Sequence, residues 1–212
     1  MSALTRQDPT QDYFSAFHDE VNREKNDRGA AILLACHVER CLRYAIAHNL
    51  TEIKDAHDVL FSARPSLHGF NGKIQFGNER RLFGKETKKN LECIKAIRNA
   101  FAHAIIPISF DTIEVRNVCE EMTMPEILPP RSIDPKTYKP TGSLSDNPTP
   151  RERFQRICEA TGHNLYIVGA VRVIAHPSRP ADQAGAARAV RMAVSGLRPL
   201  RRPVATMEQR SA

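Results

Sequence analysis

The sequence is poor in aromatic residues and lacks the marks of several protein classes. Aromatic residues make up 6% of the 212 residues, and Trp is absent. This composition argues against a β-sandwich or barrel built on aromatic cross-strand pairs. No apolar run approaches the roughly 18 residues that a membrane span needs, and the first residues lack the apolar centre of a signal peptide. We therefore expect a soluble, cytoplasmic protein that does not enter a membrane.

Cysteine and known cofactor motifs are also scarce. The five cysteines form no CxxC pair and occupy positions 36, 41, 93, 119 and 158. In a reducing compartment we expect them to be core residues rather than disulfides. Cys36, His37 and Cys41 are close in sequence, but the helical repeat turns His37 about 100° away from Cys36. Since the chain also has no phosphate-loop, dinucleotide-binding or zinc-protease motif, we expect no metal and no cofactor.

The net charge of +7 is concentrated near the end of the chain. Residues 177–212 contain seven Arg and two acidic residues, whereas residues 1–176 contain 24 basic and 22 acidic residues. A basic tail can bind nucleic acid by releasing counterions from phosphate. It can equally be a disordered terminus without a partner. The tail contains no aromatic residue that would stack on bases, which favours the second interpretation.

Apolar residues recur at spacings of three and four along most of the chain, which predicts an all-α fold. Asp27 and Asp111 are the expected N-caps of two helices, and residues 149–152 (TPRE) combine an N-cap, Pro at N1 and Glu at N3. We also expect a shorter segment capped by Thr51 and a loop around Pro65. The expected helices span residues 11–24, 28–48, 72–83, 85–103, 111–122 and 149–175.

Proline divides the chain into parts. Residues 123–150 contain seven of the 14 prolines, which excludes a regular helix and predicts an extended connector. We expect a helical body over residues 1–123, a Pro-rich connector over 124–148, a C-terminal helix over 149–176 that packs back on the body, and a basic, disordered tail over 177–212.

One segment carries residues suited to chemistry, at the end of the helix expected over 85–103. It contains Arg98, Asn99 and His103. A His near its neutral pKa can act as general base or acid on RNA, and an Arg can neutralise charge on the phosphate. The helix C-terminus favours a protonated His. These residues are therefore candidates for RNA cleavage without a metal.

The spacing of Arg98 and His103 is not decisive by itself. A second pair at the same spacing, Arg43 and His48, also occurs. Five residues correspond to about 140° around a helix, so Arg98 and His103 do not share a face. For Arg98 and His103 to act together, the helix end would have to be distorted or a second subunit would have to face the first. In the alternative without chemistry, Arg98 pairs with a buried acid and His103 caps the helix end.

Five short segments occur in order along residues 25–170: DRGAA at 27–31, LHGF at 67–70 followed by KI at 73–74, IRNAFAH at 97–103, SFD at 109–111 with VR at 115–116, and RERF at 151–154. The series resembles the mannitol operon repressor family, a branch of the HEPN superfamily of helical proteins.

The resemblance implies an α-helical, HEPN-like bundle that forms a dimer. It also implies that Arg-x4-His is the HEPN ribonuclease motif, which falls on Arg98, Asn99 and His103. Glu39 on the long helix is either the acid that orients Arg98 or an ordinary exposed residue. Many members of the mannitol-repressor branch are regulators, so the motif leaves the function open.

Three functions follow from this sequence. The first is a dimeric regulatory protein of the mannitol-repressor type that acts through protein partners or nucleic acid, because no helix-turn-helix DNA reader is evident. The second is a metal-independent HEPN endoribonuclease, of a toxin or defence type, that uses Arg98 and His103. The third is a dimeric scaffold without chemistry.

Overall fold

The computed structural model describes residues 9, 11–49, 61, 65–126 and 147–175, and this part of the chain is helical without a strand. The expected all-α class is therefore confirmed for it. The expected segment after Thr51, most of the connector and the basic tail lie outside the described residues. The elements are α2 (Gln11–Arg23), α3 (Asp27–Asn49), the short 3-10 helix η1 (Pro65–Leu67), α5 (Phe70–Glu79), α6 (Lys85–His103), α7 (Ile113–Glu121) and α8 (Pro150–Ala175).

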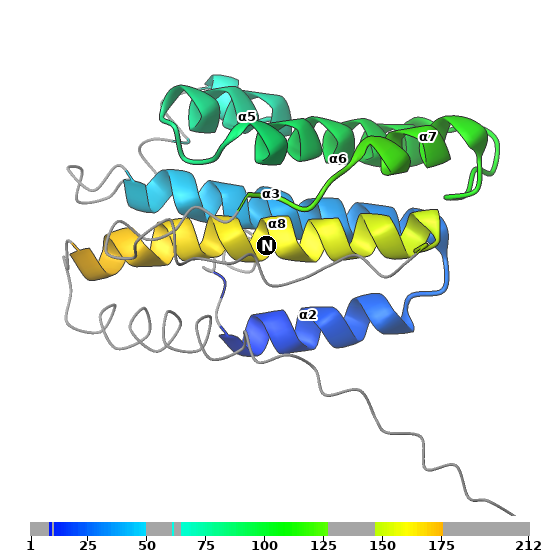
Figure 1. Cartoon of the computed structure of the whole chain (residues 1–212), viewed down its shortest axis with the longest axis horizontal. Coiled ribbons are helices and arrows are strands. Elements are labelled where there is room, and N and C mark those ends of the chain that lie inside the picture. The colour runs from blue at the N-terminus through cyan, green and yellow to red at the C-terminus, as the bar shows by residue number, and fades with distance from the viewer. Residues whose placement is uncertain (1–8, 10, 50–60, 62–64, 127–146, 176–212) are drawn as a thin grey trace, which may run out of the picture.

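Helices α3 and α8 form the centre of the bundle and make its most extensive helix–helix contact. Figure 1 shows them side by side, with α5, α6 and α7 on one side and α2 on the other. Helix α8 therefore packs along the helix that begins about 120 residues earlier in the chain. No helix of the described part is both long enough and apolar enough to cross a membrane.

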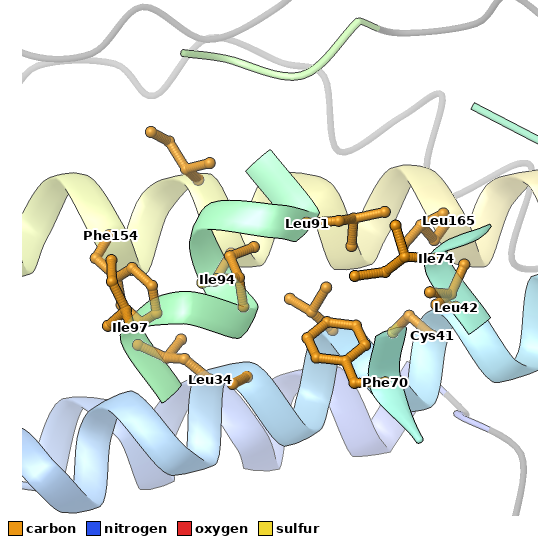
Figure 2. Packing of buried hydrophobic residues seen from close by; sticks show 14 of the residues in the cluster. Leu34, Cys41, Leu42, Phe70, Ile74, Leu91, Ile94, Ile97, Phe154 and Leu165 are labelled. Atoms are coloured by element: carbon orange, nitrogen blue, oxygen red, sulfur yellow. The ribbon is translucent and has the colours of Figure 1, made fainter. Parts of the chain in front are cut away.

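The core lies where α3, α5, α6 and α8 meet. Helix α6 buries Leu91, Ile94, Ile97 and Phe101, the apolar face that the spacing predicts. Side chains from all four helices point toward one another in this region (Figure 2), among them Leu34, Leu42, Phe70, Ile74, Phe154 and Leu165.

Small residues allow α3 and α8 to approach each other closely. An added Cβ at Gly169 of α8 would lie 2.6 Å from the ring of Tyr44 and 3.3 Å from the Cα of Ala45, both in α3. An added Cβ at Gly162 would lie 2.4 Å from Nε2 of His37. The backbone of α8 at these two glycines is thus in direct contact with α3.

We expect Gly169→Ala to lower the free energy of unfolding by about 1–3 kcal/mol, because the added methyl group overpacks this contact. Gly29→Ala in α3 is the matched control, since its Cβ meets only the flexible side chain of Glu24. Urea unfolding of both variants measures the difference. Equal stability of the two variants would contradict the close approach of α3 and α8.

Helix α2 docks through aromatic rings around the buried His37 of α3. The ring of Phe17 stacks on the His37 ring at 4.2 Å, and the Tyr13 hydroxyl lies 3.0 Å from His37 Nδ1. Burial lowers the pKa of His37 from 6.5 to about 4. His37 is therefore a neutral core residue, packed between two helices.

The helix starts differ from the expectation at two of three positions. The side chain of Asn26, not Asp27, caps α3 by accepting hydrogen bonds from the backbone N–H groups of Arg28 and Gly29 at 2.8 and 3.3 Å. Thr112, not Asp111, occupies the N-cap of α7. The capping box of α8 is confirmed: Glu152 N–H donates to Thr149 Oγ1 at 3.2 Å, and Thr149 N–H donates to Glu152 at 2.9 Å.

Helix α5 ends four residues before the expected end. Leu82 N–H donates to the Gly77 carbonyl and Arg81 N–H to the Asn78 carbonyl, both at 3.0 Å, which is the Schellman pattern of a helix C-terminus. Arg81 has φ 54°, in the left-handed region that favours glycine. An ordinary residue there costs roughly 1–2 kcal/mol. The burial of Leu82 and Phe83 directly after the turn stabilises the chain with the helix ending at this position.

Candidate functional site

The carboxylate of Asp27 joins three segments that are far apart in the sequence. One oxygen accepts a hydrogen bond from the Phe110 N–H at 3.0 Å, and the other accepts one from the Arg151 guanidinium at 2.8 Å. Arg151 also donates to the backbone carbonyls of Glu24 and Lys25. The start of α3, the start of α8 and the loop before α7 therefore meet at one junction.

The neighbour of Asp27 extends this junction to the end of α6. Arg28 donates to the Ala104 carbonyl at 2.9 Å. Two consecutive residues thus hold both ends of the loop 104–110, Arg28 at its beginning and Asp27 at its end. Beneath the loop, Phe110 packs between Phe101 of α6 and Phe154 of α8, with ring centroids 5.0 and 5.3 Å away.

The predicted site residues lie on the last turns of α6. Asn99 and His103 are exposed, and Arg98 is half-buried. Within the described part of the chain, none of the three side chains takes part in a hydrogen bond or an ion pair. Arg98 therefore has no buried acid as a partner there, and His103 makes no capping bond.

Helix α6 remains regular to its end. It continues to His103, and the Ala104 N–H closes the last turn on the Ala100 carbonyl at 2.9 Å. A regular helix separates Arg98 from His103 by about 140° around the axis. A distorted helix end is thus not what brings them together, and within one chain they face different directions. Asn99 and His103, four residues apart, share an exposed face.

Glu39 has a different partner from the one the sequence analysis considered. Its carboxylate accepts a hydrogen bond from Nζ of Lys73 at 2.6 Å, and Lys73 also donates to the His68 carbonyl at 3.0 Å. The Lys73 side chain is only 7% exposed. Because an unpaired buried ammonium is costly, Glu39 serves to neutralise Lys73. It forms no hydrogen bond with Arg98 in the described residues.

Sequence reasoning missed Lys73 as the partner of Glu39. The signal that could have found it is the spacing of Phe70, Lys73, Ile74 and Gly77, which places Lys73 on the apolar face of a helix, where a charged residue needs an acid. Burial raises the pKa of the Cys36 thiol, on which the charges of Glu39 and Arg98 also act.

The second Arg-x4-His pair has structural contacts of its own. The Arg43 guanidinium lies over the Phe61 ring, 4.7 Å from its centroid, and the His48 ring lies 4.3 Å from that of Tyr44. The side chains of Arg43 and His48 therefore pack against aromatic rings, whereas those of Arg98 and His103 make no ring contact in the described residues.

Large apolar side chains are exposed beside the end of α6. The loop after His103 carries Ile105 and Ile106, which are 99% and 70% exposed, and Ile113 at the start of α7 is 66% exposed. Neighbouring exposed apolar residues of this size mark surfaces that bind other molecules. We call the set Arg98, Asn99, His103, Ile105 and Ile106 the α6-end surface.

The described residues contain no cluster of three His, Cys, Asp or Glu side chains that could hold a metal ion. In comparisons with known proteins, no family model, no curated protein and no solved structure matches the chain.

The junction gives a testable prediction with a matched control. We expect Arg151→Ala to speed amide hydrogen exchange in residues 104–112, because Asp27 loses the group that holds its carboxylate in place. Arg153→Ala, two residues along α8, removes a contact to the Met122 carbonyl instead and should affect residues 120–126. Mass-spectrometric exchange measures both. A uniform increase across the chain in Arg151→Ala would contradict a local role.

Proposed function

We propose that this protein is a regulator of the mannitol-repressor type that works as a homodimer and acts through a partner rather than through a DNA-reading helix. The observation that carries the proposal is the junction at Asp27. Three of the five segments on which the resemblance depends, those around Asp27, Phe110 and Arg151, meet there through hydrogen bonds. A shared place in one junction gives these three segments a common structural reason to occur together, which supports the resemblance.

The exposed isoleucines support the dimer. Ile105 and Ile106 present apolar area within the α6-end surface, and a second copy related by a two-fold axis would bury the same residues on both subunits. Such a dimer also places Arg98 of one subunit near His103 of the other. This arrangement overcomes the separation of about 140° within one chain.

We expect the Ile105→Ser/Ile106→Ser double variant to be a folded monomer, because neither side chain contributes to the core. Sedimentation of the wild type at micromolar concentration should give a dimer. Gln75→Ser/Glu79→Ser on the exposed side of α5 is the matched control and should remain dimeric. A monomeric wild type would contradict the proposed assembly.

The regulatory role is tested in cells that lack the gene and are complemented with each variant. Wild type and the α5 control should restore the levels of a limited set of transcripts, whereas the isoleucine variant should not. Transcript levels that do not respond to deletion of the gene would contradict a regulatory role.

A metal-independent HEPN endoribonuclease is the second candidate, favoured by the absence of bonding partners for Arg98, Asn99 and His103 in the described residues. A polar group that forms no hydrogen bond or ion pair within the fold is available to a substrate. In this mechanism His103 acts as general base on the 2′-hydroxyl or as general acid on the leaving oxygen, and Arg98 stabilises the charge on phosphate.

If the protein cleaves RNA, we expect His103→Ala to abolish cleavage without a loss of stability, since His103 is exposed. Arg98→Ala should do the same, with a small loss of stability because its stem is half-buried. The measurement is cleavage of a mixed RNA pool, with and without EDTA, and products should end in 2′,3′-cyclic phosphate. Cleavage that survives both substitutions would contradict this assignment, and a silent wild type would exclude the ribonuclease.

A further inference from the structure

The solvent side of α6 carries a row of basic side chains that the proposed function has not used. Lys85, Lys88, Lys95, Asn99 and His103 lie within about 80° of one another around the helix axis. The helix contains five basic and two acidic residues. The row therefore runs along the helix and ends at His103, in the α6-end surface.

Neighbouring acids neutralise this row only in part. The Glu86 carboxylate is engaged by the hydroxyl of Thr123 at 2.9 Å, and Glu92 lies 4.0 Å from Lys88 in an exposed pair. The Glu126 carboxylate binds the N–H groups at the start of α6 and so fills that position. Lys85 is exposed, Lys88 and Lys95 are half-buried, and neither Lys85 nor Lys95 forms an ion pair in the described residues.

The turn between α5 and α6 extends the row with Arg80 and Arg81, both exposed. The Arg80 guanidinium lies over the ring of Phe76, 5.4 Å from its centroid. Arg81 adopts φ 54°, where glycine is favoured, and its side chain makes no hydrogen bond or ion pair in the described residues. The exposed Arg81 guanidinium is therefore available to an anionic ligand. We call Arg80, Arg81, Lys85, Lys88 and Lys95 the α6 basic row.

The position of acidic residues fixes the side on which a ligand would lie. Glu120 and Glu121 of α7 are exposed along one flank of α6, whereas on the other flank Lys95 donates to Asn71 of α5 at 2.7 Å. An anionic ligand is therefore favoured on the side toward α5.

We propose that the α6 basic row binds the phosphate backbone of RNA and guides the strand to the α6-end surface. The inference rests on the proposed function and names its partner. From Lys85 to His103 the helix is about 27 Å long, which is enough to contact several successive phosphates. The exposed face of α6 has no aromatic residue, so it provides charge without base stacking. RNA is the nucleic acid assigned because the row ends at His103, whose imidazole is suited to act on a 2′-hydroxyl.

The test measures binding of a labelled mixed-sequence 30-nucleotide RNA by fluorescence anisotropy at several salt concentrations. Lys85→Gln/Lys95→Gln removes two phosphate contacts and should reduce the salt slope by about 1.4 and the affinity by about 25-fold at 0.1 M salt. Lys25→Gln/Arg156→Gln removes the same charge from exposed positions elsewhere and should bind like the wild type. All proteins are full-length, so the basic residues 177–212 contribute equally.

Arg81→Gly separates binding from folding. Glycine is favoured at φ 54°, so the melting temperature should stay the same or rise while the affinity for RNA falls about fivefold. A structural role for Arg81 would give the opposite pattern, a lower melting temperature with unchanged affinity, and would overturn its assignment.

Other outcomes also decide the proposal. Equal losses in the α6 and control double variants would show attraction by overall charge, and equal affinity for DNA of the same sequence would overturn the assignment to RNA. A wild type that restores transcript levels but binds no RNA would overturn the α6 row and leave the regulatory function standing. RNA binding without any effect on transcripts would support the α6 basic row and overturn the regulatory function.

Discussion

The Asp27 carboxylate is the constraint on which the arrangement of the helices depends. It is only partly exposed, and its two oxygens are bound by an N–H before α7 and by a guanidinium on α8. A partly buried carboxylate needs such donors, because losing one leaves charge without compensation. Removing Arg151 would therefore loosen the loop 104–110, whose end Asp27 holds through the Phe110 N–H. The closeness of α3 and α8, made possible by Gly162 and Gly169, supplies the packing around it.

The molecule separates the residues that stabilise it from those available for function. Two pairs of charged residue types, Asp27 with Arg151 and Glu39 with Lys73, are joined by hydrogen bonds inside the fold. Arg98, Asn99 and His103 differ: they have no such bond in the described part of the chain and stand beside exposed isoleucines. Substitution of this second group is expected to alter recognition while the fold persists. The Arg28 contact to the Ala104 carbonyl links the groups, since it holds the chain directly after His103.

The comparison of expected and observed helices shows where local signals are sufficient. The limits of α6 agree with the apolar spacing, because its ends coincide with Gly84 and with the break before Pro107. Helix α5 ends earlier than expected, because a turn after it buries Leu82 and Phe83. This turn requires a left-handed backbone conformation at Arg81. At α3, Asn26 and Asp27 are both good caps by residue type. Asn26 caps the helix because the Asp27 carboxylate is already bound by the Phe110 N–H and by the Arg151 guanidinium.

The sequence by itself determined the all-helical class of the described residues, the capping box of α8 and the position of Arg98, Asn99 and His103 at a helix end. These features depend on residues within one or two helical turns of each other, so spacing alone encodes them. Only the tertiary structure decided that Glu39 pairs with Lys73, 34 positions away, and that Asp27 pairs with Arg151, 124 positions away. Such partners are chosen by which helices pack together, because the burial of a charge creates the need for a counter-charge from whichever segment lies nearest.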